Sequence, residues 1–235
     1  YMLMGVVTAM AVLFFSIPLL TFGRGQLHKI DVTTAAPLLL VVHPSSPPRT
    51  VQEFIEWARK KGDVSFGSAG VGSGGHLAGE LFKLMTKVKG EHIPYKGTGP
   101  ALADLMGARY DYNFSGLQSA LVQSRAGKLR ALAVTSAKRL NALPDVPAMS
   151  EALPGYEVLG WYGIIGPAKM PAALTKKLNA DLVAALKSPD VDKRIRADGS
   201  EPVGSSPEAF REFMSADLAK WTKVVKEGNI KVEGL

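Results

Sequence analysis

The stretch "VSFGSAGVGSGGHLAGELF", residues 64–82, constrains the fold more than any other part of the sequence. An apolar run ends at Phe66, five glycines and two serines follow within nine residues, and an amphipathic helix is predicted to begin at His76. Because glycine has no Cβ atom, the backbone N–H groups of such a loop can approach a ligand closely. The N-terminus of the helix that follows favours negative charge. The order of strand, glycine-rich loop and helix therefore predicts a binding site for an anion.

Main-chain N–H groups would hold this anion, because few side chains in the loop carry a donor. The loop lacks the Gly-Lys-Ser/Thr ending of a nucleotide-hydrolysing P-loop, and it lacks Gly-x-Gly-x-x-Gly with an acid on a later strand. A flexible turn without a ligand is the alternative interpretation. The residues predicted here to contact the ligand are Ser68, Ala69, Gly70, Gly72, Ser73 and His76.

The segment "PYKGTGPAL", residues 94–102, is a second candidate for ligand contact. Tyr95 and Lys96 could line an anion cleft while Thr98 caps a following helix. Alternatively, the segment is an ordinary strand-to-helix turn whose Tyr95 fills the edge of the core. The sequence leaves both interpretations open.

Two further residues lie at predicted strand ends. Ser115 directly follows the strand "YDYNF", and the carboxyl ends of parallel strands are where ligands bind in open α/β sheets. A turn serine without a ligand is the alternative. Trp161 begins a later strand and could form an aromatic wall for a ligand or pack in the core.

Apolar runs alternate with helical patterns along most of the chain. Thr50 and Glu53 form a capping box before one helix, in which Val51, Phe54, Ile55 and Ala58 lie on one apolar face. The helix after the glycine-rich loop carries Leu77, Leu81, Leu84 and Met85 at helical spacing, and the last helix lays Phe210, Phe213, Met214, Leu218, Trp221 and Val225 on one face. A proline-rich loop is expected at 143–158. This alternation is typical of an α/β architecture with a largely parallel sheet. Strands are predicted at Leu38–Val42, Val64–Phe66, 91–97, 110–114, 129–134 and 161–171, and three final helices near Leu174, at Ser188-Pro189 and at Ser206-Pro207.

Composition argues against several classes of function. The net charge of +7 favours acidic partners, but the basic residues are scattered and have no aromatic residues among them, which argues against nucleic acid. The absence of cysteine removes disulfides, thiol catalysis and cysteine-ligated zinc. The four histidines show no metal-ligand spacing such as His-Glu-x-x-His. We therefore expect no nucleic acid, no metal and no cofactor.

The first 22 residues carry no charge. An uncharged segment of this length is long enough for a transmembrane helix, which needs ~20 residues. Pro18, the β-branched pair Val6 and Val7, and the polar Thr8 favour a buried strand followed by a loop instead. No basic segment precedes this run, as a signal peptide would require.

Several motifs, taken in order, resemble one known family. They are "FGSAGVGSGGHLAGELF", "HIPYKGTGPALADLMG", "AGKLRALAVTSAKRLNALPDVPAMSEALPGYEV", "NADLVAALKSPDV", "EPVGSSPEAF" and "WTKVVKEGNIK". From about Leu38 to Lys231 the chain resembles the Bug-type periplasmic substrate-binding proteins of tripartite tricarboxylate transporters. The resemblance implies a two-lobed, type II-like Venus-flytrap fold that closes on a small carboxylate, whether a di- or tricarboxylate or an aromatic carboxylate. It also implies a monomer that loses a signal peptide, works in the periplasm, delivers its ligand to membrane permease subunits and is not an enzyme.

The resemblance also implies a domain organisation. The first lobe would comprise 1–43 and 163–235, lacking its N-terminal part, and the second lobe would comprise 44–162. Hinge strands would lie near 38–44 and 163–168, and Thr8 would contact the ligand from the first lobe.

Ser115 stands where many members of the family carry an aspartate that selects amino-bearing ligands. This departure favours a plain carboxylate over an amino acid. Two other functions are considered: a serine hydrolase or acyl-transferase that uses Ser73 with His76, and the sensor lobe of a transcription regulator. The enzyme is disfavoured because a histidine three residues later on a helix rarely offers its ring correctly, and no orienting acid is evident.

Overall fold

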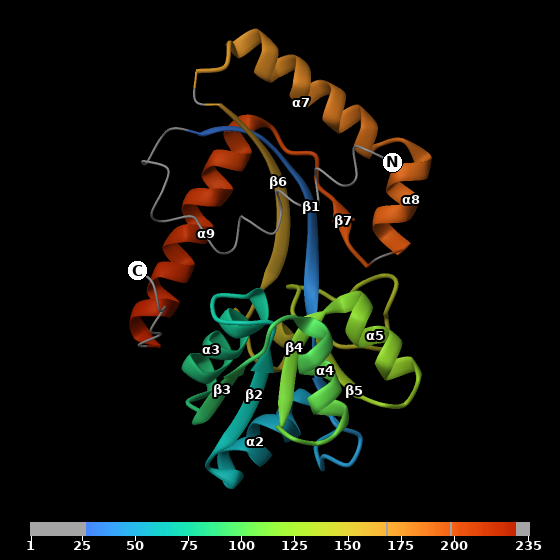
Figure 1. The fold of residues 1–235 in the computed structure, drawn as a ribbon, viewed down its shortest axis with the longest axis vertical. Coiled ribbons are helices and arrows are strands. Elements are labelled where there is room, and N and C mark those ends of the chain that lie inside the picture. The colour runs from blue at the N-terminus through green and yellow to red at the C-terminus, as the bar shows by residue number, and fades with distance from the viewer. Residues whose placement is uncertain (1–26, 168, 198, 229–235) are drawn as a thin grey trace. The chain divides into compact units, whose positions relative to one another are not determined.

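The computed structural model describes residues 27–167, 169–197 and 199–228 (Figure 1). Thr8 and the uncharged first 22 residues lie outside the described residues, so the strand predicted there stays a prediction. None of the described helices combines the length and the apolar character needed to cross a lipid bilayer. The elements are β1 (Leu27–Val42), α2 (Val51–Lys61), β2 (Val64–Ser68), α3 (Gly74–Thr86), β3 (Gly90–Pro94), α4 (Thr98–Met106), β4 (Tyr112–Gly116), α5 (Leu117–Arg125), β5 (Arg130–Val134), α6 (Met149–Ala152), β6 (Leu159–Pro167), α7 (Ala172–Leu186), α8 (Pro189–Ala197), β7 (Glu201–Pro202) and α9 (Pro207–Glu227).

The described chain divides into two compact units. The larger unit contains 36–160 and 221–228, and the smaller one contains 27–35 and most of 161–220. The chain passes from one unit to the other within β1, β6 and α9. Such a division into two units agrees with the α/β, two-lobed class predicted from the sequence, while the predicted lobe boundaries and hinge strands stay predictions.

The sheet of the larger unit has the strand order β3-β2-β4-β1-β5. β2 is parallel to both β3 and β4, with Ser68 opposite Pro94 and Phe66 opposite Tyr112. β1 is antiparallel to β4 and β5. The prediction of a largely parallel sheet therefore holds for β2, β3 and β4. It is wrong for β1, which enters the unit from 27–35 and runs opposite to its neighbours.

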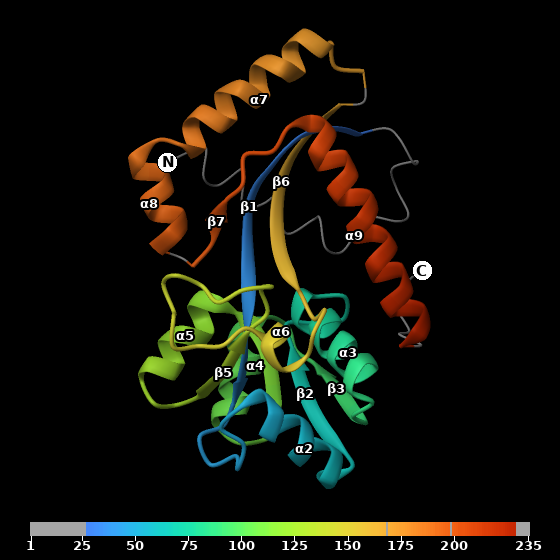
Figure 2. The ribbon, with the colours of Figure 1, turned by 180° about the vertical axis from the view of Figure 1, so that it is seen from behind.

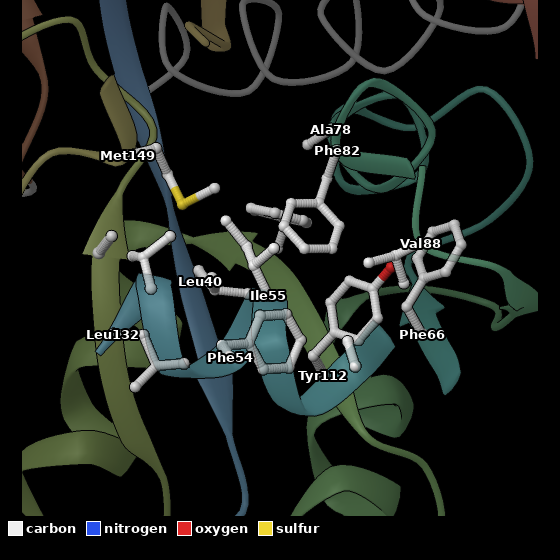
Figure 3. Close-up of a cluster of buried hydrophobic side chains, with 14 of the residues drawn as sticks. Leu40, Phe54, Ile55, Phe66, Ala78, Phe82, Val88, Tyr112, Leu132 and Met149 are labelled. Atoms are coloured by element: carbon white, nitrogen blue, oxygen red, sulfur yellow. The ribbon is translucent and has the colours of Figure 1, made fainter. Parts of the chain in front are cut away.

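Helices cover both faces of this sheet. Successive buried side chains along a strand point to opposite faces, so each face needs its own layer of helices. Leu40 and Val42 of β1 face one cluster with α2, α3 and α6, while Leu39 and Val41 face another with α4 and α5. Figure 1 shows α4 in front of the sheet, and Figure 2 shows α2 in front of the opposite face. The first cluster is rich in aromatic rings that pack edge to face or offset (Figure 3). Its largest members are Phe54, Phe66, Phe82, Phe114, Tyr112 and Tyr156.

The start of α2 confirms the capping residue read from the sequence. The Thr50 hydroxyl accepts the N–H of Glu53 at 3.2 Å, which satisfies one free donor of the first turn. The Glu53 carboxylate accepts the N–H of Arg49 rather than that of Thr50. The face predicted to be apolar is buried, namely Val51, Phe54, Ile55 and Ala58.

Helix α3 begins at Gly74, two residues before the predicted start, and its predicted apolar face is right for Leu77, which is buried, but not for every leucine. Leu81 and Leu84 are only half-buried, whereas Ala78 and Phe82 are fully buried. Gly79 lies against the Phe66 ring, where an added Cβ would overlap the ring. Small residues therefore let α3 approach the sheet closely, which a pattern of leucines does not reveal.

The smaller unit joins the first part of β1 to β7 and to three helices. The Asn179 side chain on α7 donates to the carbonyls of Ile30 (3.0 Å) and Ser205 (2.7 Å). The Ser206 hydroxyl accepts the N–H of Ala209, which confirms the predicted start of α9. The predicted apolar face of α9 is right for the fully buried Phe210 and wrong for Leu218, which is 61% exposed.

Candidate functional site

Three helices begin at one edge of the larger unit's sheet. The parallel strands β2, β3 and β4 end at this edge and lead into α3, α4 and α5 respectively. The N–H of Gly97 donates to the carbonyl of Ala69 at 3.1 Å, so the loops before α3 and α4 lie side by side. Helix N-termini carry unpaired N–H groups and partial positive charge, so this edge attracts anions.

The loop from Ser68 to Ser73, called the anion loop here, is held in shape by its own first residue. The Ser68 hydroxyl is buried, donates to the carbonyl of Gly70 at 2.9 Å and accepts the N–H of Gly70 at 3.1 Å. His92 Nε2 on β3 lies 2.7 Å from the same oxygen. Because the single hydroxyl proton goes to Gly70, His92 donates here and carries its proton on Nε2.

The other end of the anion loop is held by His76. Its Nδ1 accepts the N–H of Gly72 at 3.0 Å, so the proton of the neutral ring is on Nε2. Burial, with a smaller contribution from Lys83, lowers the pKa of His76 to about 4. The prediction that His76 contacts the ligand stays a prediction. The ring is 4% exposed, and it orders the loop by accepting a hydrogen bond.

The main-chain N–H groups of this region fall into two sets. Those of Gly70, Gly72, Ser73 and His76 have protein acceptors, so the expectation of free amides along the loop is wrong for Gly70, Gly72 and Ser73. Within the part of the chain that the structure describes, four other N–H groups have no acceptor: those of Ala69, Val71, Gly74 and Gly75. Gly74 and Gly75 were not among the predicted contacts. A helix start at Ser73 would have revealed them, because the first-turn N–H groups of a helix have no internal partner.

Glycine is favoured at three positions of this turn, Gly70, Gly72 and Gly75, and Gly70 has φ +139°. Gly72 has φ +77°, a region that side chains with a Cβ rarely adopt. An added Cβ at Gly75 would overlap the carbonyl oxygen of Phe114. The first turn of α3 therefore lies directly on the end of β4.

Ser115, the residue after Phe114, carries an unpaired polar atom. Ser115 is 3% exposed, and its hydroxyl has no hydrogen-bond partner among the residues that the structure describes. Buried hydroxyls without partners are uncommon and costly, and they call for an explanation. A hydroxyl at the carboxyl end of β4, beside the start of α5 at Leu117, is placed to serve a ligand at this edge.

The contacts of Tyr95 and its neighbours fit an ordinary strand-to-helix turn better than the lining of an anion cleft. The Tyr95 hydroxyl donates to Asp104 at 2.9 Å, and its ring packs against the cluster that contains Tyr110. Burial raises the pKa of Tyr95 to about 12. Thr98 caps nothing, because α4 has Gly97 as its N-cap without a side-chain bond. Lys96 is exposed beside the anion loop.

Trp161 belongs to the smaller unit. Its indole N–H donates to Asp217 at 3.0 Å, and its ring packs edge to face against Phe210 and Phe213. These contacts within its own unit occupy much of the side chain, and a ligand contact for Trp161 stays untested.

Two serine–histidine pairs lie at the anion loop, Ser73 with His76 and Ser68 with His92, and neither is arranged for nucleophilic catalysis. Ser73 accepts the N–H of His76 and has no bond to its ring, so the predicted Ser73–His76 pair is not formed. Ser68 does contact His92, but its hydroxyl is 1% exposed and saturated by three bonds. A nucleophile must reach its substrate and needs a base that takes its proton. The geometry favours binding over chemistry.

Sequence comparison decides the family. The profile of the "Tripartite tricarboxylate transporter family receptor" (TctC) matches residues 1–230. The chain belongs to this family. The resemblance read from the motifs is thereby confirmed. Family and fold point to binding proteins rather than to enzymes.

Similar proteins include a "UPF0065 protein in tcbD-tcbE intergenic region" from Pseudomonas sp., 36% identical over 84% of this chain and 60% of that protein. "Protein BugT" from Bordetella pertussis is 33% identical over 88% of the chain and 64% of its own length. This TctC-family chain thus spans about 60% of the length of each of these two relatives.

Solved structures show the same fold. "R. palustris Rpa4515 with adipate" has a TM-score of 0.80 at 35% identity and covers 89% of this chain and 71% of its own. "MatC (Rpa3494) from Rhodopseudomonas palustris with bound malate" has a TM-score of 0.75 at 29% identity, covering 92% and 75%. The fold of this TctC-family chain is therefore that of the two-lobed periplasmic binding proteins.

Proposed function

We propose that this chain is the carboxylate-binding part of an extracytoplasmic solute receptor. The observation that carries the proposal is the group of unpartnered N–H donors at Ala69, Val71, Gly74 and Gly75, where α3 begins against the end of β4. Donors without acceptors at a helix N-terminus bind carboxylates well. Similar solved structures with adipate and malate bound make a small dicarboxylate the favoured ligand.

The mechanism is charge capture without proton transfer. One carboxylate accepts hydrogen bonds from two or three of these amides, each contributing about 1.5–3 kcal/mol because the acceptor is charged. The dipole of α3 adds to this attraction. Together with the water released on binding, such bonds reach ~micromolar affinity after the entropic cost of association. The Ser115 hydroxyl supplies one further donor.

The ligand is a carboxylic acid without an amino group. The segments at the site edge, 69–75, 95–99 and 115–118, contain no aspartate or glutamate that would pair with an ammonium group. Calorimetry on the full-length protein should therefore show deaminated acids binding more tightly than the matching amino acids. Tighter binding of the amino acids would contradict this selectivity.

The remaining parts of the receptor follow from family membership. The second lobe, 44–162, would close against a first lobe of 1–43 and 163–235 by bending near 38–44 and 163–168, and Thr8 and Trp161 would contact the ligand from there. Two strands that pass between lobes permit such a rigid-body motion. The receptor would act in the periplasm as a monomer and pass its ligand to the permease subunits of a tripartite transporter.

A thermal-shift screen tests the proposal. The full-length protein is heated with a panel of mono-, di- and tricarboxylic acids that includes adipate and malate. A ligand that binds only the folded state raises the melting temperature in proportion to the logarithm of its concentration above Kd. We expect at least one dicarboxylate to do so. A flat response to every acid at millimolar concentration would contradict the proposed function.

A further inference from the structure

The rings of His76 and His92 lie face to face beneath the anion loop. Their centroids are 3.8 Å apart with an interplanar angle of 15°, and both rings also pack on Phe66. His76 comes from α3 and His92 from β3, so the pair joins two elements that are separate in sequence. The sequence gives no sign of this pairing, because the two residues share no motif.

Each ring fixes a different part of the loop. His76 Nδ1 holds the N–H of Gly72 at 3.0 Å. His92 Nε2 holds the hydroxyl of Ser68, which in turn binds both main-chain polar groups of Gly70. Two of the loop's own N–H groups are thereby directed inward. The alternate ones, of Ala69 and Val71, are left without protein acceptors.

The rings of His76 and His92 act in their neutral, unprotonated form. Burial is the main cause that lowers the pKa of His76 to about 4 and that of His92 to about 3, and Lys83 adds to both. A protonated His76 would lose the lone pair on Nδ1 and release Gly72. Glu80 lies 3.9 Å from His76 Nε2, and Lys83 binds that carboxylate at 2.8 Å.

We infer that His76 and His92 are positioning residues, which set the alternation of inward and outward amides in the anion loop without contacting the ligand. This inference rests on the proposed function for its effect on affinity. One part of the inference does not depend on any ligand. It states that the imidazole nitrogens, and not the bulk of the rings, hold Gly70 and Gly72. A loop ordered before binding loses less entropy when the ligand arrives.

Matched substitutions separate the nitrogen atom from the ring. The amide oxygen of asparagine sits where Nδ1 of histidine does, and the amide of glutamine reaches the place of Nε2. His76→Asn should therefore keep the acceptor for Gly72, while His76→Gln should lose it. For His92 the order is reversed: His92→Gln should keep the bond to Ser68, and His92→Asn should lose it. Both members of each pair lose the ring.

Amide hydrogen exchange in the unliganded full-length protein is the primary test. The amide proton of Gly72 should exchange at least about tenfold faster in His76→Gln than in His76→Asn, because one hydrogen bond is lost. Gly70 should respond in the same way to His92→Asn against His92→Gln. Equal exchange within each pair would overturn the inference, because ring packing alone would then order the loop.

Affinity for adipate and malate is the second readout. His76→Gln and His92→Asn should bind more weakly than their partners by about tenfold, at matched free energies of unfolding. Equal affinities within each pair, where the wild-type protein binds, would overturn the inference. If the wild-type protein binds neither acid, the proposed function is in question, and amide exchange still decides the role of the two histidines.

Discussion

Gly75 packs on the main-chain carbonyl of Phe114, so the first turn of α3 lies directly against the end of β4. Alanine at this position has no room for its Cβ, and either α3 or β4 must shift. We expect Gly75→Ala to lower the free energy of unfolding by about 1–3 kcal/mol, as overpacking does. Urea denaturation measures this change.

Gly74→Ala is the matched control. Its Cβ would meet only a Leu38 methyl group at 3.8 Å, which is ordinary contact. The stability of Gly74→Ala should be equal to or above that of the wild-type protein, because alanine favours helix more than glycine does. Equal stability of the two alanine variants would show that α3 does not depend on this close approach.

The unpaired hydroxyl of Ser115 leads to opposite expectations for stability and binding. Removing a buried hydroxyl without a partner costs nothing and can stabilise. Ser115→Ala should therefore keep or raise the urea midpoint, yet weaken carboxylate binding by about threefold to tenfold because one donor is lost. A variant with lower stability and unchanged affinity would assign Ser115 a purely structural role.

The buried His76 and the half-buried His92 predict a pH dependence of stability. Unfolded histidine has a pKa near 6.5, and the folded values are about 4 for His76 and about 3 for His92. As the pH falls below 6.5 the unfolded state takes up protons before the folded state does, so stability is complete above that pH and is lost progressively towards pH 4. Between pH 7 and 5 the free energy of unfolding should fall by about 2–4 kcal/mol.

Urea titrations at several pH values check this slope. Glu80 and Lys83 of α3 are the charged side chains of the described residues that face the pair, and they are unchanged in the control. The double variant His76→Asn with His92→Gln removes both titrating groups, so its stability should vary much less over the same range. A wild-type slope that the double variant reproduces would mean that other groups are responsible.

Local chemistry made much of the fold predictable. Thr50 and Ser206 cap helices where the sequence placed them, and Val51, Phe54, Ile55 and Ala58 are buried as their spacing indicated. Contacts between residues that are distant in the sequence could not be predicted from it. The antiparallel direction of β1 depends on pairing with β4 and β5, and the face of α3 depends on the space left by Gly79 against Phe66.

The glycines of the loop predict a candidate site, but some of the amides expected to be free are hydrogen-bonded within the protein. The loop was expected to present all of its N–H groups, whereas Ser68 and His76 turn those of Gly70 and Gly72 inward. Nothing in the sequence shows that His92, from another strand, supports Ser68. Side chains that satisfy a loop from outside it are set by tertiary packing, which a motif does not encode.

The amide of Gly74 offers the most direct test that free main-chain donors bind the ligand. Gly74 is the first residue of α3, where proline is tolerated, and Ser73 before it has ψ 159°, which suits a residue preceding proline. Gly74→Pro removes one unpartnered N–H and no helical hydrogen bond, while Gly74→Ala keeps that N–H. Isothermal titration calorimetry of both variants should use the acid that gives the largest thermal shift. We predict that Gly74→Pro stays folded and binds about 10- to 100-fold more weakly, and that Gly74→Ala binds like the wild-type protein. Wild-type affinity in the proline variant would contradict this prediction.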